Sequence, residues 1–183
     1  MRKIYKNKKK GLAFWIIGLP GSGKTTFAWT IKEEISKKFG KTVVVSGDII
    51  RNMFHLNKFT KEERILIGKK YTEFCKFLIN QNINVIFAAI GLFKDIRSYN
   101  RKLLKKNYVE IYINSNIKKI IRARKKKIYT KYKKNILAVD IKPEYPKSPD
   151  IMIKNDFKKN KTQIKKILLN KINKLVFPNY KNK

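Results

Sequence analysis

One eight-residue motif near the N-terminus constrains this chain more than any other feature. Residues 18–25 read Gly-Leu-Pro-Gly-Ser-Gly-Lys-Thr, a complete G-x-x-x-x-G-K-[ST] phosphate-binding loop. The apolar run Leu12–Ile17 before it predicts a strand buried on both faces, and Lys24–Lys38 after it predicts a helix that Gly40 ends. A strand, a glycine loop and a helix in this order predict a nucleoside triphosphate site.

Each position of the motif has a chemical role. Glycines let successive backbone N–H groups turn toward a phosphate, and the helix N-terminus adds a partial positive charge. Lys24 can reach the β- and γ-phosphates, and the Thr25 hydroxyl can ligate Mg²⁺. The alternative, a glycine turn that only permits packing, does not require the complete motif. The predicted ATP-binding residues of this segment are Gly18, Leu19, Pro20, Gly21, Ser22, Gly23, Lys24, Thr25 and Thr26.

Strand and helix patterns alternate along the rest of the chain. We predict further strands at residues 42–45, 84–90, 108–113 and 151–153. Helices are predicted at about 61–80 after a Thr60–Glu63 capping box, at 95–105, at 116–127 and after Asn160 and Gln163 near the C-terminus. This order predicts the α/β class and a P-loop nucleoside triphosphate hydrolase fold, with a parallel sheet of about five strands sandwiched by helices.

Length and charge set the domain organisation and the kind of partner. The 183 residues suit one domain, expected at 11–177 between a basic tail at 1–10 and a C-terminal tail at 178–183. There are 46 basic and 12 acidic residues, which give a formal charge of +34. Because 39 of the basic residues are lysine, part of this charge reflects an A/T-rich codon composition. The remainder favours an anionic partner.

The basic clusters at 125–127 and 131–134, interleaved with Tyr129 and Tyr132, could bind nucleic acid. No nucleic-acid-binding motif accompanies them, and lysines occur throughout the chain. A solvated surface or a lid that attracts phosphate accounts for them better, which disfavours nucleic acid as a partner.

Cysteine, histidine and hydropathy exclude several other classes. The single Cys75 and the single His55 leave no intramolecular disulfide and no Cys- or His-rich metal site. Residues 1–19 imitate a signal peptide, but the apolar part is short and runs into the glycine motif without a cleavage pattern. No apolar run is long enough to cross a membrane. We therefore expect a cytoplasmic protein without a membrane partner.

The second predicted strand ends in a candidate acceptor site. Open α/β sheets bind ligands at the carboxyl ends of their strands, and Asp48 follows this strand directly. Asp48 could orient or deprotonate an attacking hydroxyl, or hold Mg²⁺ through water, and Arg51 could clamp an anionic acceptor. The spacing is equally compatible with Asp48 as the N-cap of a following helix.

These residues together resemble the adenylylsulfate kinases over about Gly11 to Asp156. The resemblance is carried by Trp15, the phosphate loop, the G-D-x-x-R that follows the second strand, Phe59-Thr60, Glu63-Arg64, the strand 85–90, and Asp140 with Pro146 and Pro149. It implies transfer of phosphate from ATP, with Mg²⁺, to the 3′-hydroxyl of adenylylsulfate. It also implies Lys24 and Asp48 as catalytic residues and Thr25 and Asp48 as metal ligands.

The resemblance extends to a lid and to the acceptor. Arg122 and Arg124, placed in a lid over the transferred phosphate, complete the predicted ATP site. The predicted acceptor-binding residues are Arg51, Phe59, Lys69, Ile90 and Lys127. Phe59 could stack on the acceptor base, or serve only as a hydrophobic staple before the helix that Thr60 caps. The oligomeric state stays open, a homodimer included.

The chain departs from the family pattern only on the acceptor side. Ser46 replaces the first Asp of D-G-D, residues 66–70 replace E-N-I-R-R, Gly91 replaces the Ser of I-S-P-Y-R, and Ile136 replaces a Phe. This distribution suggests a changed acceptor, and similar enzymes of capsule-building pathways phosphorylate cytidine diphosphoramidate.

The competing class of protein is a P-loop NTPase that binds nucleic acid. It needs a Walker-B carboxylate after the strand at 84–90, where none precedes Gly91.

Overall fold

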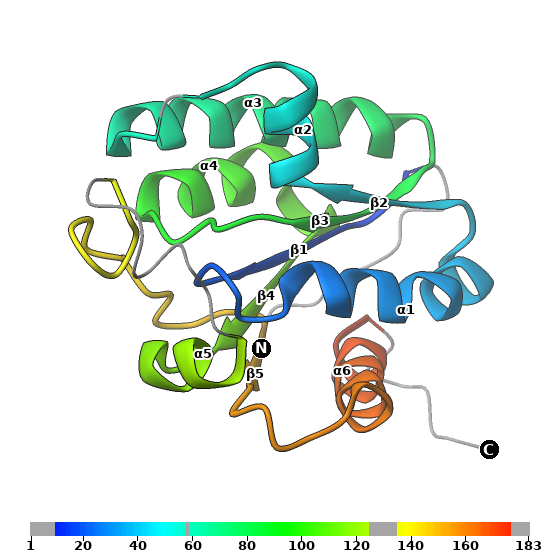
Figure 1. The fold of residues 1–183 in the computed structure, drawn as a ribbon. Coiled ribbons are helices and arrows are strands. Elements are labelled where there is room, and N and C mark those ends of the chain that lie inside the picture. The colour runs from blue at the N-terminus through cyan, green and yellow to red at the C-terminus, as the bar shows by residue number, and fades with distance from the viewer. Residues whose placement is uncertain (1–9, 58, 125–134, 177–183) are drawn as a thin grey trace.

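The computed structural model describes residues 10–57, 59–124 and 135–176. Five parallel strands form one sheet in the order β2-β3-β1-β4-β5, with helices on both faces (Figure 1). The strands are β1 (Ala13–Gly18), β2 (Thr42–Ser46), β3 (Asn84–Ala88), β4 (Tyr108–Asn114) and β5 (Ile151–Lys154). The predicted fold class is confirmed.

Two apolar cores lie on the two faces of the sheet because the side chains of a strand alternate between its faces. Phe14 and Ile16 of β1 belong to the core under α1 and α6, whereas Trp15 and Ile17 belong to the core under α3 and α4. The helices are α1 (Lys24–Phe39), α2 (Gly47–Met53), α3 (Lys61–Asn80), α4 (Lys94–Leu104), α5 (Ile117–Arg124) and α6 (Lys161–Val176), with a 3₁₀ turn at Lys105–Asn107.

Both predicted helix caps form. The Thr60 hydroxyl accepts a hydrogen bond from the Glu63 backbone N–H at 3.3 Å. The Asn160 backbone N–H donates to Gln163 Oε1 at 3.0 Å, and the Gln163 backbone N–H donates to Asn160 Oδ1 at 2.9 Å. Each cap fixes the residue at which its helix begins, so the start of α3 agrees with the sequence prediction.

The observed boundaries of the elements differ most from the predicted ones at the carboxyl ends of the strands. β3 ends at Ala88 rather than residue 90, because its neighbour β2 ends at Ser46, which pairs with Ala88, and α2 begins at Gly47. The Ala89 N–H still donates to the Ile16 carbonyl, and the Gly18 N–H donates to the Ile90 carbonyl. The short helix α2 was not predicted as a separate element. The predicted helix at 116–127 is seen up to Arg124, and the rest of it lies outside the described residues.

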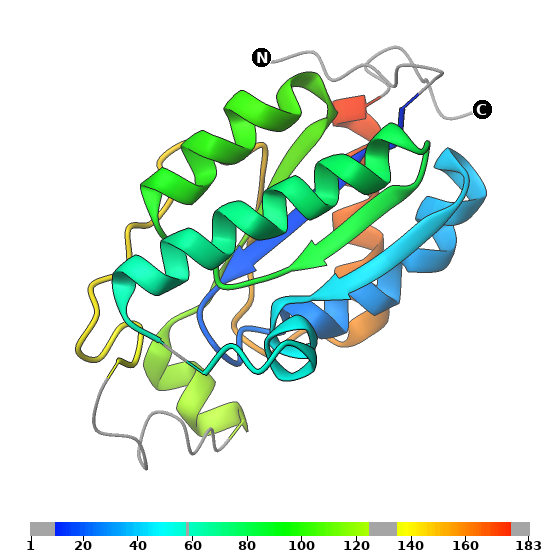
Figure 2. The same ribbon diagram turned by 90° about the horizontal axis from the view of Figure 1, so that it is seen from above.

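The parallel arrangement brings three loops to one edge of the sheet. The arrowheads of β1 and β3 point to the same edge, where α2 follows β2 (Figure 2). The phosphate-binding loop after β1 therefore faces α2 and residues 89–91.

None of the described helices is both long and apolar enough to cross a membrane. Cys75 is fully buried in the α3 core, as its place among apolar residues predicts.

Candidate active site

The motif at 18–25 folds as a loop that closes onto the start of α1. Gly23 is the N-cap of α1 in the left-handed conformation, with φ of 97°, which favours glycine. The Lys24 Nζ donates to the Leu19 carbonyl at 2.9 Å, so the lysine lies along the loop rather than away from it. The carbonyl of the buried Ser22 accepts a hydrogen bond from Asn155 Nδ2 at 2.9 Å. These contacts hold the loop in the shape that wraps a phosphate.

A cleft of about 360 Å³ opens in front of this loop. Lys24 and Thr25 line one wall, and Asp48, Arg51 and Arg64 line the other. Phe59, Ile90, Ile136 and Leu137 also line it. The structure thus brings Lys24 and Thr25 of the phosphate loop together with the predicted acceptor-binding residues Arg51, Phe59 and Ile90, although they come from different elements.

Asp48 lies in the first turn of α2, as the second residue of that helix. The N-cap is Ser46, whose side chain makes no capping hydrogen bond, so the alternative placement of Asp48 as N-cap is wrong. Asp48 is exposed and contributes the one carboxylate among the described residues that line the cleft. A carboxylate opposite Lys24 and Thr25 can address a hydroxyl that attacks a bound triphosphate.

The donor set suits Mg²⁺. In the described part of the chain, no group of three or more His, Cys, Asp or Glu residues could form a metal cage. Mg²⁺ in phosphoryl-transfer sites is held by one or two protein oxygens plus phosphates and water, and the Thr25 hydroxyl and Asp48 carboxylate line the same cleft.

Two guanidinium groups lie over the ring of Phe59. The Cζ atoms of Arg51 and Arg64 lie 4.7 and 5.3 Å from the centre of its ring. Arg51 also donates to the Leu56 carbonyl at 2.8 Å, and Arg64 Nε donates to the Phe59 carbonyl at 2.8 Å. A hydrophobic staple would need an apolar residue where Arg64 stands, so a cation–π contact replaces it.

The two arginines form a site for an anion. Burial and then the charge of the neighbouring Arg51 lower the pKa of Arg64 to about 10. Arg64 therefore remains protonated at neutral pH, while its repulsion from Arg51 is unfavourable. An anionic ligand beside both guanidinium groups would relieve that repulsion.

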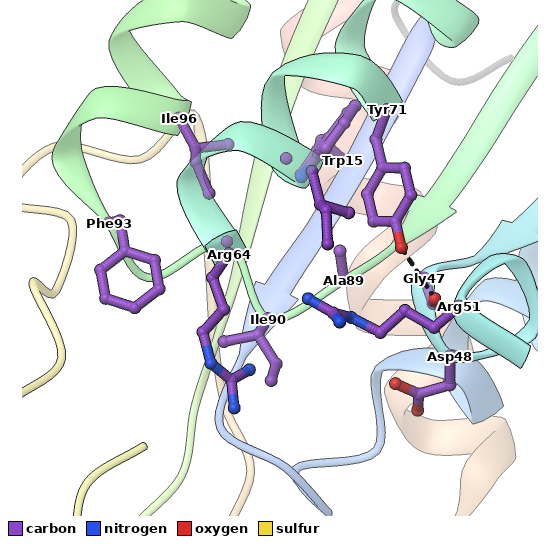
Figure 3. A pocket seen from close by; sticks show the side chains of 13 residues that line it. Trp15, Gly47, Asp48, Arg51, Arg64, Tyr71, Ala89, Ile90, Phe93 and Ile96 are labelled. Carbon is purple, nitrogen blue, oxygen red and sulfur yellow. Dashed lines mark hydrogen bonds between the residues drawn. The ribbon is translucent and has the colours of Figure 1, made fainter. Parts of the chain in front are cut away.

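A smaller pocket of about 50 Å³ continues behind the arginines (Figure 3). It shares Asp48, Arg51 and Arg64 with the cleft, and Trp15 and Tyr71 form its inner part. The Tyr71 hydroxyl donates to the Gly47 carbonyl at 3.1 Å, which fixes the ring beside α2. The acceptor side is thus deeper than the sequence indicated.

A third cavity, of about 230 Å³, lies at the other end of the phosphate loop. Thr26 lines it together with Ala123 of α5 and with Asn155 and Phe157 after β5. Its place beside the start of α1 suits the base of a bound nucleotide. Sequence reasoning missed Asn155 and Phe157 because no motif marks the segment after β5.

Not every predicted residue reaches these cavities. Lys69 lies on α3 with its Nζ 5.7 Å from the centre of the Tyr99 ring, and it lines neither the cleft nor the pocket behind it. Arg122 is exposed on α5, and Arg124 is the last residue of that helix. Lys127 lies outside the described residues. Conversely, Arg64 lines both acceptor cavities but was predicted only as part of the resemblance.

The fold and this cleft define a class of protein. A phosphate-binding loop that faces a carboxylate and two arginines, across the carboxyl edge of a parallel sheet, is the arrangement of a P-loop kinase. The family model described as adenylylsulphate kinase matches residues 10–154, and the chain belongs to this family. It is therefore a phosphotransferase that uses ATP and acts on a hydroxyl group.

Curated relatives fall into two specificities. The chain is 32% identical over 169 residues to the cytidine diphosphoramidate kinase of Campylobacter jejuni, covering 90% of this chain and 98% of the relative. It is also 32% identical over 165 residues to the adenylyl-sulfate kinase of Clostridium kluyveri, covering 87% and 83%.

Among solved structures, the APS kinase of Mycobacterium tuberculosis in complex with AMPPNP and APS has a TM-score of 0.80. It is 19% identical, and the match covers 89% of this chain and 98% of that one. A gluconokinase from Sinorhizobium meliloti has a TM-score of 0.61 at 14% identity, covering 98% of this chain and 100% of that one. These structures support the fold.

Proposed function

We propose that this chain transfers the γ-phosphate of ATP to the 3′-hydroxyl of a nucleotide, and that its preferred acceptor is cytidine diphosphoramidate rather than adenylylsulfate. The observation that carries the kinase proposal is the single cleft between Lys24 and Thr25 on one wall and Asp48, Arg51 and Arg64 on the other. Its basic wall suits an acceptor that carries phosphate.

Each group of residues in the cleft has a separate role in the proposed transfer. Amides of the phosphate loop and Lys24 bind the β- and γ-phosphates, and Asp48 orients the attacking hydroxyl and takes its proton. Arg51 and Arg64 hold the acceptor phosphate, which places the hydroxyl in line with the γ-phosphate. Thr25 and Asp48 would hold Mg²⁺, which neutralises charge on the phosphates when bound. The base of ATP occupies the cavity beside Thr26 and Phe157.

The preference for a cytidine acceptor rests on the apolar residues of the acceptor side. Ile136 reaches the cleft, where the family pattern has a Phe, and its aliphatic side chain offers less stacking surface. Ile67 and Gly91 line the smaller pocket without the amide and hydroxyl that the family pattern supplies. A smaller pyrimidine needs less stacking in the cleft, and an end group in the smaller pocket meets fewer polar partners than the family pattern would give the sulfate of adenylylsulfate. Such a specificity would place the chain in capsule biosynthesis.

The test is a comparison of kcat/KM for the two acceptors at one salt concentration. We expect the cytidine compound to be used at least about tenfold better, and added salt to raise the KM of either acceptor because its capture is electrostatic. CMP and AMP, which lack the end group of each acceptor, are the matched controls. A clear preference for adenylylsulfate would overturn the proposed specificity, and phosphorylation of neither acceptor would overturn the proposed reaction.

A further inference from the structure

An indole N–H without a hydrogen-bond partner lies at the inner end of the smaller pocket. Trp15 is 1% exposed and stacks on Phe87, with ring centres 4.4 Å apart and an 8° angle between the planes. Among the described residues, no acceptor meets its Nε1. Burial of an N–H donor without an acceptor is unfavourable. A ligand atom that accepts a hydrogen bond from this nitrogen would remove that cost.

The nitrogen lies next to the part of the pocket wall that Gly91 forms. A Cβ atom added to Gly91, which lines the same pocket, would lie 3.4 Å from Trp15 Nε1. Gly91 has φ of 55°, and an added Cβ would also clash with Ile17 Cγ2, so a residue without a side chain fits best at this point of the wall beside the indole. Figure 3 shows Trp15 beside Tyr71, on the side of the pocket away from Asp48.

The size of the pocket limits what can reach the indole. A volume of about 50 Å³ holds a group of a few heavy atoms, because one water needs about 10–15 Å³ on this measure, and it excludes a nucleobase. Arg51 and Arg64 line its entrance from the cleft, and the rest of its lining includes the apolar Ile67, Phe93 and Ile96. The pocket therefore suits a small anionic group attached to a nucleotide whose base stays in the larger cleft.

We infer that the Trp15 indole N–H donates a hydrogen bond to an oxygen of the acceptor's end group, a sulfate or phosphoryl-type group held beside Arg51 and Arg64. This inference rests on the proposed function. Because an indole nitrogen donates and cannot accept, it selects an oxygen. In a phosphoramidate end group, an oxygen would face Trp15, and the amine would face away from it.

The indole signal of Trp15 in NMR tests this contact directly. The chain has two tryptophans, and Trp29 is 52% exposed on α1, so Trp29→Phe assigns the signals. With a non-hydrolysable ATP analogue present, cytidine diphosphoramidate or adenylylsulfate should shift the Trp15 indole proton downfield, whereas CMP and AMP should not. Equal shifts with the monophosphates, or no shift at a saturating concentration of a nucleotide that the enzyme phosphorylates, would overturn the inference.

Trp15→Phe removes the N–H but retains an aromatic ring, and Trp29→Phe is its matched control. We expect kcat/KM for the acceptor to fall about ten- to a hundredfold through KM, with the KM for ATP unchanged, because the lost bond is made to a charged group. A variant that only loses thermal stability and keeps its acceptor KM would overturn the inference and leave the proposed function standing. If the wild-type enzyme phosphorylates neither acceptor, the proposed function fails, and the inference fails with it.

Discussion

The two walls of the cleft are built in different ways. The proposed ATP wall is a continuous stretch of chain, residues 18–26, which would bind phosphate through backbone amides and one lysine. The acceptor wall consists of side chains from separate elements, chiefly Asp48 and Arg51 of α2 and Arg64 of α3. A backbone site depends on the conformation of one loop, whereas a side-chain site depends on how several helices pack. We therefore expect single substitutions to alter the ligand of the acceptor wall more readily than that of the ATP wall.

The most damaging change should be on the ATP wall. Lys24→Ala removes a preorganised charge from the transferred phosphate, and we expect kcat to fall about 10²–10³-fold. Thermal unfolding should be nearly unchanged, since Lys24 lies in the cleft and not in either core. Lys37→Ala, in the last turn of the same helix, is the control. A folded Lys24→Ala enzyme with normal turnover would contradict the assignment of this wall.

Asp48→Asn tests whether the acceptor wall contributes chemistry as well as binding. The amide keeps the shape of the carboxylate but cannot take a proton, so we expect kcat to fall about 10²-fold with little change in the KM for ATP. Asp48 also lies in the first turn of α2, where a negative charge favours the helix by about 0.3–1 kcal/mol, so a small loss of stability accompanies the change. Unchanged turnover would leave Asp48 with this helix role only.

Arg64→Lys should affect only the acceptor. Lysine keeps the charge but loses the planar fork that lies over Phe59 and donates to the Asn135 carbonyl at 2.9 Å. We expect the acceptor KM to rise about tenfold, because one hydrogen bond to a charged group is lost, and the KM for ATP to stay constant. Lys70→Ala on the exposed side of α3 is the control. A matching rise in the ATP KM would show that the two walls are coupled.

The smallest effect should come from Glu144, which binds the acceptor-side helices together. It pairs with Lys61 of α3 at 2.8 Å and accepts from the Lys94 N–H of α4 at 2.6 Å, and these bonds, that of Lys61 first, lower its pKa below 4.5. A lowered pKa means that its stabilising effect is present above pH 4.5 and is lost as the pH falls through the folded-state value.

Glu144→Gln should therefore lower the melting temperature by a few degrees at most at pH 7, and the difference from wild type should vanish in acid. The pair is partly exposed, so salt should also reduce the difference. A difference that persists unchanged well below pH 4.5 would show that the charge of Glu144 is not its cause.

The contrast between one contiguous loop and side chains from separate elements also explains how much of the structure could be predicted from the sequence. The strands, the long helices and the phosphate loop follow from periodicity, caps and one contiguous motif, so they were predicted within a few residues. The role of Arg64 could not be predicted from the residues alone, because it depends on α3 lying beside α2. The pocket at Trp15 requires β1, α3, α4 and the turn at 89–91 to meet in space. Lys69 has the charge of an acceptor ligand, but the rotation of α3 directs it to Tyr99.

The hydrogen bond from Asn155 to the Ser22 carbonyl has a consequence for biosynthesis. It joins residues 133 positions apart, and Asn155 also accepts from the Phe157 N–H, so the buried amide is held from both sides. The phosphate loop leaves the ribosome early, yet its last hydrogen bond forms only after β5 has been made. A nascent chain that stops before residue 155 has the whole motif without its final support. ATP affinity during synthesis should therefore rise late, when β5 joins the edge of the sheet.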